Sequence, residues 1–253
     1  MTESGSRIRL LDVPVDPIGM QQTLDWVAER IASGEHGTHL CVNAANVVRA
    51  HADPEYRELL ERTTVIGADG QPMVWASRLL GRGLPERVAG IDLMERVLDT
   101  AVERGWRVFL LGARSEVVQR LADQLRARGI EIVGAHDGYF DTEDAEDLIE
   151  EIRRSGADVL FVGMPTPTKE RFIVERTGKA GVPVCIGVGG SFDVLVGDLR
   201  RAPKLMQRLG LEWLFRLFQE PRRLFVRYAV TNTRFVALLL KAMVQRGRDT
   251  GRS

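Results

Sequence analysis

Short apolar segments rich in β-branched residues alternate along this chain with longer segments in which apolar residues recur at helical spacing. Two segments with the helical pattern end at glycine, a frequent helix terminator, at 117–129 and 145–156. Four short apolar segments are clear, each ending in Asn or Gly: 38–43, 107–112, 157–163 and 182–189. The alternation predicts an α/β, Rossmann-like fold in which helices flank a mostly parallel sheet.

The length of 253 residues and the hydrophobic content of 44% suit one large α/β domain with an appendage. In open parallel sheets ligands bind beyond the carboxyl ends of the strands, so the loops after the four short segments are the first places to look for chemistry.

The neutral total charge conceals two unequal parts. From Leu199 to Ser253 the chain has 13 Lys and Arg against three acidic residues, a net charge of +10, which leaves −10 for residues 1–198. We therefore predict an α/β core over 1–198 and a basic helical appendage over 199–253.

Large apolar residues and arginines interleave from Gly210 onward, over two expected helices separated near Pro221. Such basic amphipathic helices can lie in a membrane interface and meet anionic headgroups. The alternative is an ordinary amphipathic pair docked on the core or on a second copy of the chain, as in a homo-oligomer. A nucleic-acid partner is not predicted, because the tail aromatics are spaced as a helix face: Trp213, Phe215, Phe218 and Phe225.

Neither a secretory signal nor a membrane-spanning segment is expected, because no apolar stretch approaches roughly 18 residues. The two cysteines, Cys41 and Cys185, lie far apart without metal-ligand spacing. Cytoplasmic thiols and peripheral membrane contact are the prediction.

Asp69 stands beside Gly70, after a short apolar run and before a helix opened by Pro72. Taken alone, such an aspartate is most often a turn or helix-cap residue. In the next motif, RVAGIDL, Asp92 is first interpreted as an N-cap and second as a ligand group. Arg87 could pair with a phosphate, although a lone loop arginine is usually only solvated.

A glycine-rich run, GVGGSFD, follows the last apolar segment, and Gly189 and Gly190 would let backbone amides approach a diphosphate. It is not a dinucleotide fingerprint, since Phe192 occupies the place of the third glycine, and this disfavours a nicotinamide dehydrogenase. No D-x-D pair is present, so a sugar-nucleotide enzyme built on this chain should use neither metal nor cofactor.

Lys169 and Glu170 follow the loop GMPTPT at an expected helix start facing the cleft. A Lys-Glu pair at such a place is more often a solvated face than a catalytic element.

Taken together, these motifs resemble the bacterial WecG/TagA/CpsF glycosyltransferase family, over nearly the whole chain. The family order is recognisable in VNAANVV (42–48), ADGQPMVWASRLLG (68–81), RVAGIDL (87–93), FLLGA (109–113), GYF (138–140), VGMPTPTKERF (162–172), GVGGSFDVLVGDLRRAP (187–203) and LEWLFRLFQEPRRLFVRY (211–228).

The resemblance implies a cell-envelope polysaccharide enzyme at the inner face of the bacterial membrane. It would transfer N-acetylmannosamine, or a related hexose or uronic acid, with inversion from a UDP-sugar to a polyprenyl-diphosphate-linked sugar. By this resemblance Asp69 is the general base, Asn43 holds sugar or nucleotide, and the loop from Gly187 to Asp193 lines the UDP pocket. The tail would complete the site, with four arginines as candidates to contact the diphosphate: Arg216, Arg222, Arg223 and Arg227.

Two positions depart from the family pattern. Cys41 stands where many members have Thr, and Lys169 stands where many have Gln and the family contacts substrate. Lysine could meet a phosphate or an acidic sugar. A catalytically silent sugar-nucleotide-binding or scaffold protein is the alternative from another functional class.

Overall fold

The computed structural model describes residues 6–141 and 145–250, apart from the side chains at positions 223, 247, 249 and 250. Within these ranges the main sheet has six parallel strands in the order β4-β3-β8-β7-β5-β6. The bounds are β3 Gly37–Val42, β4 Val65–Ala68, β5 Arg107–Gly112, β6 Glu131–His136, β7 Val159–Gly163 and β8 Val184–Gly187. The predicted α/β class and parallel sheet are confirmed.

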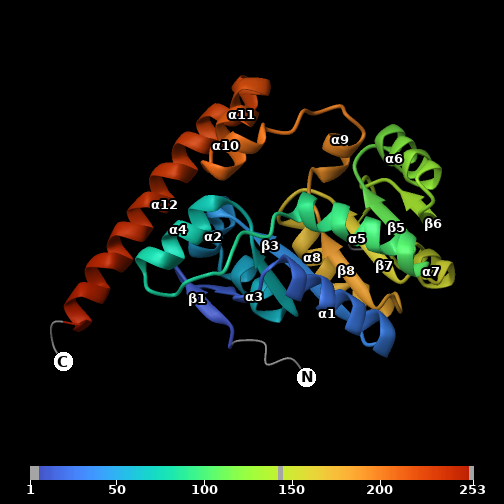
Figure 1. Cartoon of the computed structure of the whole chain (residues 1–253), viewed down its shortest axis with the longest axis horizontal. Coiled ribbons are helices and arrows are strands. Elements are labelled where there is room, and N and C mark those ends of the chain that lie inside the picture. The colour runs from blue at the N-terminus through green and yellow to red at the C-terminus, as the bar shows by residue number, and fades with distance from the viewer. Residues whose placement is uncertain (1–5, 142–144, 251–253) are drawn as a thin grey trace.

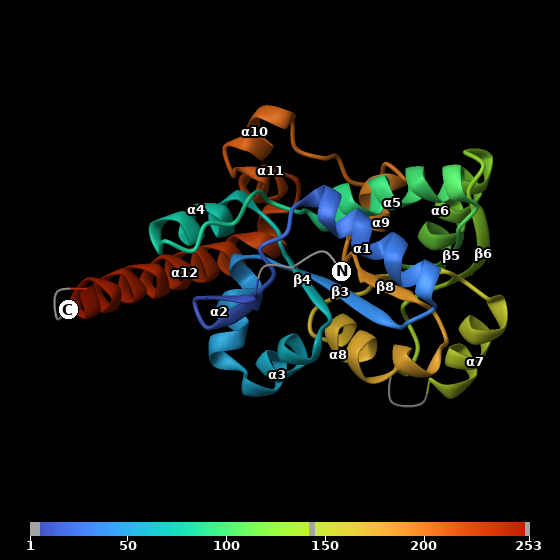
Figure 2. The same ribbon diagram turned by 60° about the horizontal axis from the view of Figure 1, so that its bottom comes forward.

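Both faces of the sheet are buried, because successive side chains of a strand point to opposite faces and helices cover each one. On β5, Phe109 and Leu111 join one hydrophobic cluster while Val108 and Leu110 join the other. Figure 2 shows helices layered on either side of the strands. One layer is α1 Met20–Ser33, α5 Gly90–Arg104 and α6 Ser115–Ala127; the other is α2 Ala44–Ala52, α3 Pro54–Arg62, α7 Glu146–Ser155 and α8 Thr168–Glu175.

The four predicted strands are present with ends shifted by up to two residues, and two strands of the sheet were not predicted. β4 has only four residues, one of them Gly67, so its apolar run is too short to be recognised alone. β6 lies at the sheet edge with half-buried side chains and therefore lacks a continuous apolar pattern. An additional antiparallel hairpin joins β1 Ile8–Leu10 to β2 Val13–Val15.

The remaining helices are short except the last: α4 Gln71–Leu79, the 3₁₀ turn Thr177–Lys179, α9 Ser191–Leu195, α10 Lys204–Arg208, α11 Glu212–Gln219 and α12 Pro221–Thr250. The predicted separation at Pro221 is confirmed, because α11 ends just before it and α12 begins there.

Helix α12 runs as a long rod along the side of the core (Figure 1). Leu224 and Phe235 on its inner face are buried, and the helix packs against α2. Of the two alternatives for the tail, docking of an amphipathic helix on the core is therefore confirmed for the inner face of α12. The outer face is exposed and apolar, and the division of the chain at residue 198 stays a prediction.

The chain leaves β3 toward β4 on one side of the sheet, whereas after β8 it continues to α9, which packs against α6 on the other side, so the connections that follow these two neighbouring strands diverge. Ligands bind at such switch points, beyond the carboxyl ends. The candidate residues Asn43, Asp69, Lys169 and Gly189 all follow strands that end at this edge.

Candidate active site

Asp69 lies between β4 and α4 and is held by its backbone. Its N–H donates to the carbonyl of Val42 at 2.8 Å, which links the loop to the neighbouring strand. Gly70, with φ +93°, is the N-cap of α4, and Pro72 lies in the first turn. The Asp69 carboxylate is thus not the helix cap of the first interpretation, and it makes no hydrogen bond with the residues that the structure describes.

The pKa of Asp69 is raised to about 6, first by burial and then by the negative charge of Glu212. The positive charges of Arg87 and Arg216 act in the opposite direction, and Asp92 adds a smaller increase. Such a carboxylate is ionised at neutral pH yet more basic than an ordinary aspartate. Both properties suit a general base.

Asn43 and Cys41 lie at the end of β3, beside this loop. The Asn43 side-chain carbonyl caps α2 by accepting from the N–H groups of Ala45 at 2.9 Å and Asn46 at 3.3 Å. Among the described residues its Nδ2 group has no partner and remains available to a ligand. The Cys41 thiol donates to the carbonyl of Val88 at 3.4 Å.

Burial raises the pKa of Cys41, the nearby Asp69 charge raises it further, and Lys169 lowers it. The thiol is therefore neutral and unreactive, and it lies close enough to the charges of Asp69 and Lys169 to respond to both.

Lys169 and Glu170 are buried, so of the two interpretations left open the solvated face is the one that does not apply. Only 7% of Lys169 and 1% of Glu170 is exposed, and the Lys169 ammonium lies 3.2 Å from Glu170 Oε1. Helix α8 begins at Thr168, so both residues lie in its first turn, and the Lys169 side chain packs against Gly187 at the end of β8. The same Oε1 accepts from Thr166 at 3.0 Å and Tyr56 at 3.3 Å. Pairing and these hydrogen bonds offset part of the cost of burying two charges, while Glu170 Oε2 is buried without a hydrogen-bond partner among the described residues.

The Lys169 ammonium faces the glycine-rich loop that follows β8. A Cβ added to Gly189, which has φ +54°, would lie 4.0 Å from Lys169 Nζ. Gly190 is exposed, and Asp193 is half-buried in the first turn of the five-residue α9. The structure thus brings Gly189 to Lys169, and it shows no contact of Asp193 with those candidates whose side chains are described.

Arg87 is not merely solvated, because an ion-pair network connects it to the C-terminal helices. Its Nη1 donates to Glu212 of α11 at 2.5 Å, and its Nη2 donates to Gln207 of α10 at 2.9 Å. Asp92 lies 3.6 Å from Arg87 and pairs closely with Arg201. The N-cap of α5 is Ala89, so the interpretation of Asp92 as a cap is wrong.

The tail arginines occupy different places. Arg216, on α11, is exposed but close enough to lower the pKa of Asp69. Arg222 and Arg227 are exposed on α12, and the Arg227 guanidinium lies 5.9 Å from the Tyr228 ring centre. Arg223 lies on α12, but its side chain is outside the described part of the chain.

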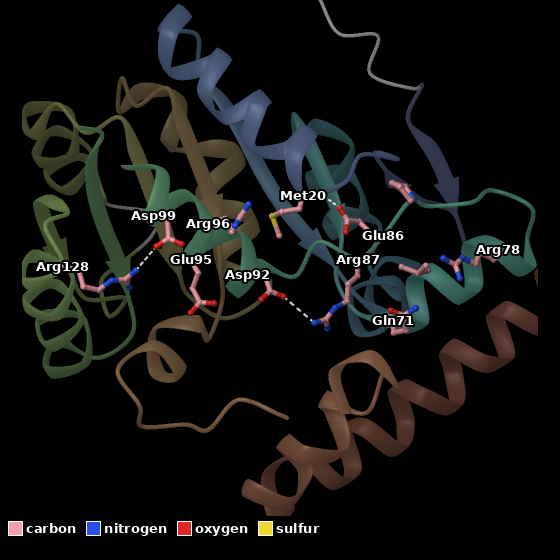
Figure 3. Close-up of a pocket in the computed structure, with 12 residues that line it drawn as sticks. Met20, Gln71, Arg78, Glu86, Arg87, Asp92, Glu95, Arg96, Asp99 and Arg128 are labelled. Atoms are coloured by element: carbon pink, nitrogen blue, oxygen red, sulfur yellow. Dashed lines mark hydrogen bonds and ion pairs between the residues drawn. The ribbon is translucent and has the colours of Figure 1, made fainter. Parts of the chain in front are cut away.

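A polar cavity of about 710 Å³ opens beside this network (Figure 3). Arg87 and Asp92 face one another across it, and Asp99 pairs with Arg128 farther along α5. Its lining is Met20, Gln71, Val74, Arg78, Pro85, Glu86, Arg87, Asp92, Glu95, Arg96, Asp99 and Arg128. Asp69 does not line it, but Gln71 and Arg87 connect the cavity to the loop that holds Asp69.

Sequence reasoning did not identify Glu212, Gln207 or Arg201 as part of this site. Glu212 had a signal, since it is one of three acidic residues in the basic tail. Arg201 had no such signal, because the acidic residues that it pairs with lie on α5, about a hundred residues earlier in the chain. The site is thus assembled from strand ends and from the C-terminal helices together.

A comparison of the sequence with protein-family models shows which family the chain belongs to. The model of the Glycosyl transferase WecG/TagA/CpsF family matches residues 8–249. The chain belongs to this family. The glycosyltransferase therefore needs a sugar donor and an acceptor, and Asp69, Lys169 and the C-terminal arginines lie within the matched region. None of its described helices is both long and apolar enough to cross a bilayer.

Proposed function

We propose that this glycosyltransferase moves a sugar from a UDP-sugar to a polyprenyl-diphosphate-linked sugar, with inversion, during cell-envelope polysaccharide synthesis. The observation that carries the proposal is Asp69, a half-buried carboxylate at a strand end with a pKa of about 6 and no capping role. Asp69 accepts the proton of the acceptor hydroxyl as that oxygen attacks the anomeric carbon, and UDP leaves from the opposite face.

Charge on the departing diphosphate is stabilised by cations and backbone amides, without a metal ion. Lys169, the amides at Gly189 and Gly190, and Arg216 are the groups proposed for this role. Arg87 is occupied by Glu212 and Gln207, so its contact with a phosphate requires exchange of that ion pair.

The donor sugar is proposed to be N-acetylmannosamine or a related hexose or uronic acid. Asn43 supports binding of a sugar or nucleotide, because its Nδ2 group is unspent while its carbonyl caps α2. Lys169 supports a preference for an anionic oxygen, since its ammonium is held by Glu170 beside the glycine-rich loop.

The outer face of α12 is proposed to rest on an anionic membrane at the cytoplasmic side. Its exposed apolar residues include Val226, Val236 and Leu240, and basic side chains such as Arg234 lie along one edge. Leu240→Glu should weaken flotation with anionic vesicles, whereas Val102→Glu, at an exposed apolar position on α5, should not. Equal flotation of both variants would refute this part of the proposal.

The test of the reaction is a mass measurement. Purified protein is incubated with a panel of UDP-sugars and a short-chain lipid-diphosphate N-acetylglucosamine acceptor. The proposal expects an acceptor product heavier by one sugar residue, formed with wild-type protein and strongly reduced with Asp69→Asn. Binding of UDP-sugar without any product would instead support the silent binding protein.

A further inference from the structure

Gln71 is a polar side chain close to the candidate base that has no partner in the fold. It is the first residue of α4, two residues after Asp69, and it is half-buried. Its amide makes no hydrogen bond with any residue that the structure describes, and it lines the polar cavity together with Arg87 (Figure 3). Gln71 therefore offers an unused donor and an unused acceptor near the reacting atoms.

The start of the Gln71 side chain is held from two directions. On one side, the Asp69 N–H donates to the carbonyl of Val42 at 2.8 Å, and Gly70 is the N-cap of α4. On the other side, Gly210 between α10 and α11 approaches so closely that an added Cβ would lie 3.2 Å from the Gln71 Cβ. The amide end is thus the part of Gln71 that is free to meet a ligand in the cavity.

The cavity wall beside Gln71 is polar, but its charges are already paired. Arg87 donates to Glu212 at 2.5 Å and lies 3.6 Å from Asp92. Arg78, which has no ion pair with a described residue, lies about two helical turns farther along α4. A ligand at Gln71 therefore meets a neutral amide, whose matching partner is a hydroxyl group that both donates and accepts. The volume of about 710 Å³ is within the usual range for a small-molecule site.

The strand order places the groups proposed for the donor on one side of Asp69 and α4 on the other. Lys169 and Gly189 follow β7 and β8, whereas Asp69 follows the edge strand β4, with β3 between them. Helix α4 extends outward from this edge, away from β8 (Figures 1 and 2). Inversion requires the acceptor to attack from the face opposite to the leaving group. The acceptor is therefore expected on the α4 side of Asp69, where Gln71 lies.

We propose that the polar cavity receives the sugar of the acceptor, and that the Gln71 amide forms a hydrogen bond with a hydroxyl group of this sugar other than the attacking one. This inference rests on the proposed function and adds to it the place of the acceptor sugar and a residue that selects it. Proton transfer stays with Asp69. Gln71 favours an acceptor that carries the hydroxyl group, because an acceptor without it leaves the amide unpaired in the complex.

The test combines Gln71→Ala with acceptors that each lack a single hydroxyl group. Short-chain lipid-diphosphate N-acetylglucosamine is compared with its deoxy forms, of which the form without the attacking hydroxyl gives no product. In wild-type protein, kcat/KM should fall about tenfold with one of the remaining forms, as expected for loss of a hydrogen bond. Gln71→Ala should lower kcat/KM for the complete acceptor by a similar factor, and it should then use that deoxy form equally well. Its affinity for UDP should equal that of wild-type protein.

Gln124→Ala is the matched control, because Gln124 is an exposed glutamine on α6 whose side chain has no partner among the described residues. It should keep the wild-type rates with every acceptor. A deoxy penalty that persists in Gln71→Ala would overturn the inference, and weaker UDP binding together with that persistent penalty would assign Gln71 to the donor instead. Equal use of the complete acceptor and all reactive deoxy forms by wild-type protein overturns the inference alone. Absence of transfer to the complete acceptor from every UDP-sugar would overturn the proposed function as well.

Discussion

The candidate site has a core side and a C-terminal side, and the two are built differently. The core side presents Asp69, Cys41 and Lys169 from strand ends, buried or half-buried and held by backbone bonds and the Glu170 network. The C-terminal side presents Arg216 and Glu212 from α11, with Arg216 exposed and Glu212 held mainly through its ion pair with Arg87.

The candidate base thus lies on the rigidly held core side, whereas some of the charges that shift its pKa lie on the C-terminal side. Groups held by packing keep their positions in any solution, whereas ion pairs with partly exposed side chains weaken as salt screens them. The charge that adjusts the pKa of Asp69 comes partly from Glu212 and Arg216, so the C-terminal helices influence a base that they do not carry.

The largest expected effect comes from the core side. Asp69→Asn should reduce transfer by roughly 10²- to 10⁴-fold, the range for loss of a general base, and leave UDP affinity nearly unchanged. The raised pKa means that the ionised carboxylate costs folding free energy at neutral pH, so the variant should melt at a higher temperature at pH 7.5. That gain should disappear at acidic pH, where the aspartate is protonated. Lower activity together with lower stability would point to structural damage.

Glu170→Gln tests how far the core side depends on paired buried charge. The Lys169 ammonium would lose its carboxylate while buried, at a cost of about 3 kcal/mol in unfolding free energy. Urea unfolding measures this loss. As the control, Glu150→Gln removes a carboxylate from the surface pairs with Arg153 and Arg154 and should change stability little. Similar losses of stability in both variants would contradict the distinction between buried and surface ion pairs.

Lys169→Gln removes the buried cation beside the glycine-rich loop, which is proposed to meet the donor. The ratio of kcat/KM between an acidic UDP-sugar and its neutral counterpart should fall by about tenfold, as expected for loss of one charge-assisted hydrogen bond. Lys169→Arg, which keeps the charge, should retain part of the preference. An unchanged ratio in Lys169→Gln would show that Lys169 does not contribute to the choice of donor sugar.

Arg201→Gln breaks the ion pairs that join the segment before α10 to Asp92 and Glu95 of α5. Stability should fall by about 1 kcal/mol at low salt and by less at high salt, because these pairs are partly exposed. Arg128→Gln breaks a pair with Asp99 on the same helix, away from the C-terminal helices. Only Arg201→Gln should also speed proteolysis between residues 199 and 211.

The smallest expected effect is at His39, on the same strand as Cys41. Both ring nitrogens are buried without a hydrogen-bond partner among the described residues, and burial lowers the pKa of His39 to about 4. His39→Leu should therefore stabilise the fold by about 1 kcal/mol at neutral pH. The gain should grow as pH falls from 6.5 toward 4, since the unfolded wild-type chain binds a proton that the folded chain cannot. A pH-independent gain would contradict this account.

The fold was largely predictable because apolar runs such as 107–112 are buried on both faces of the sheet and end at glycine. The candidate base was predictable only through its neighbours, since Asp69 alone has the features of a turn residue. The environment of Lys169 could not be predicted, because its partner Glu170 is held by Tyr56 and Thr166, which pattern and spacing do not connect. For the same reason, nothing local indicated that Arg87 pairs with Glu212.

The pH dependence of kcat/KM for acceptor tests the central claim most directly, because it reports the ionisation of groups in the free enzyme. If Asp69 is the base, the wild-type rate should fall below a pH of about 6, and Glu212→Gln should move that limit to lower pH. A wild-type rate that stays constant down to a pH of about 4.5, well below the raised pKa, would contradict Asp69 as the base.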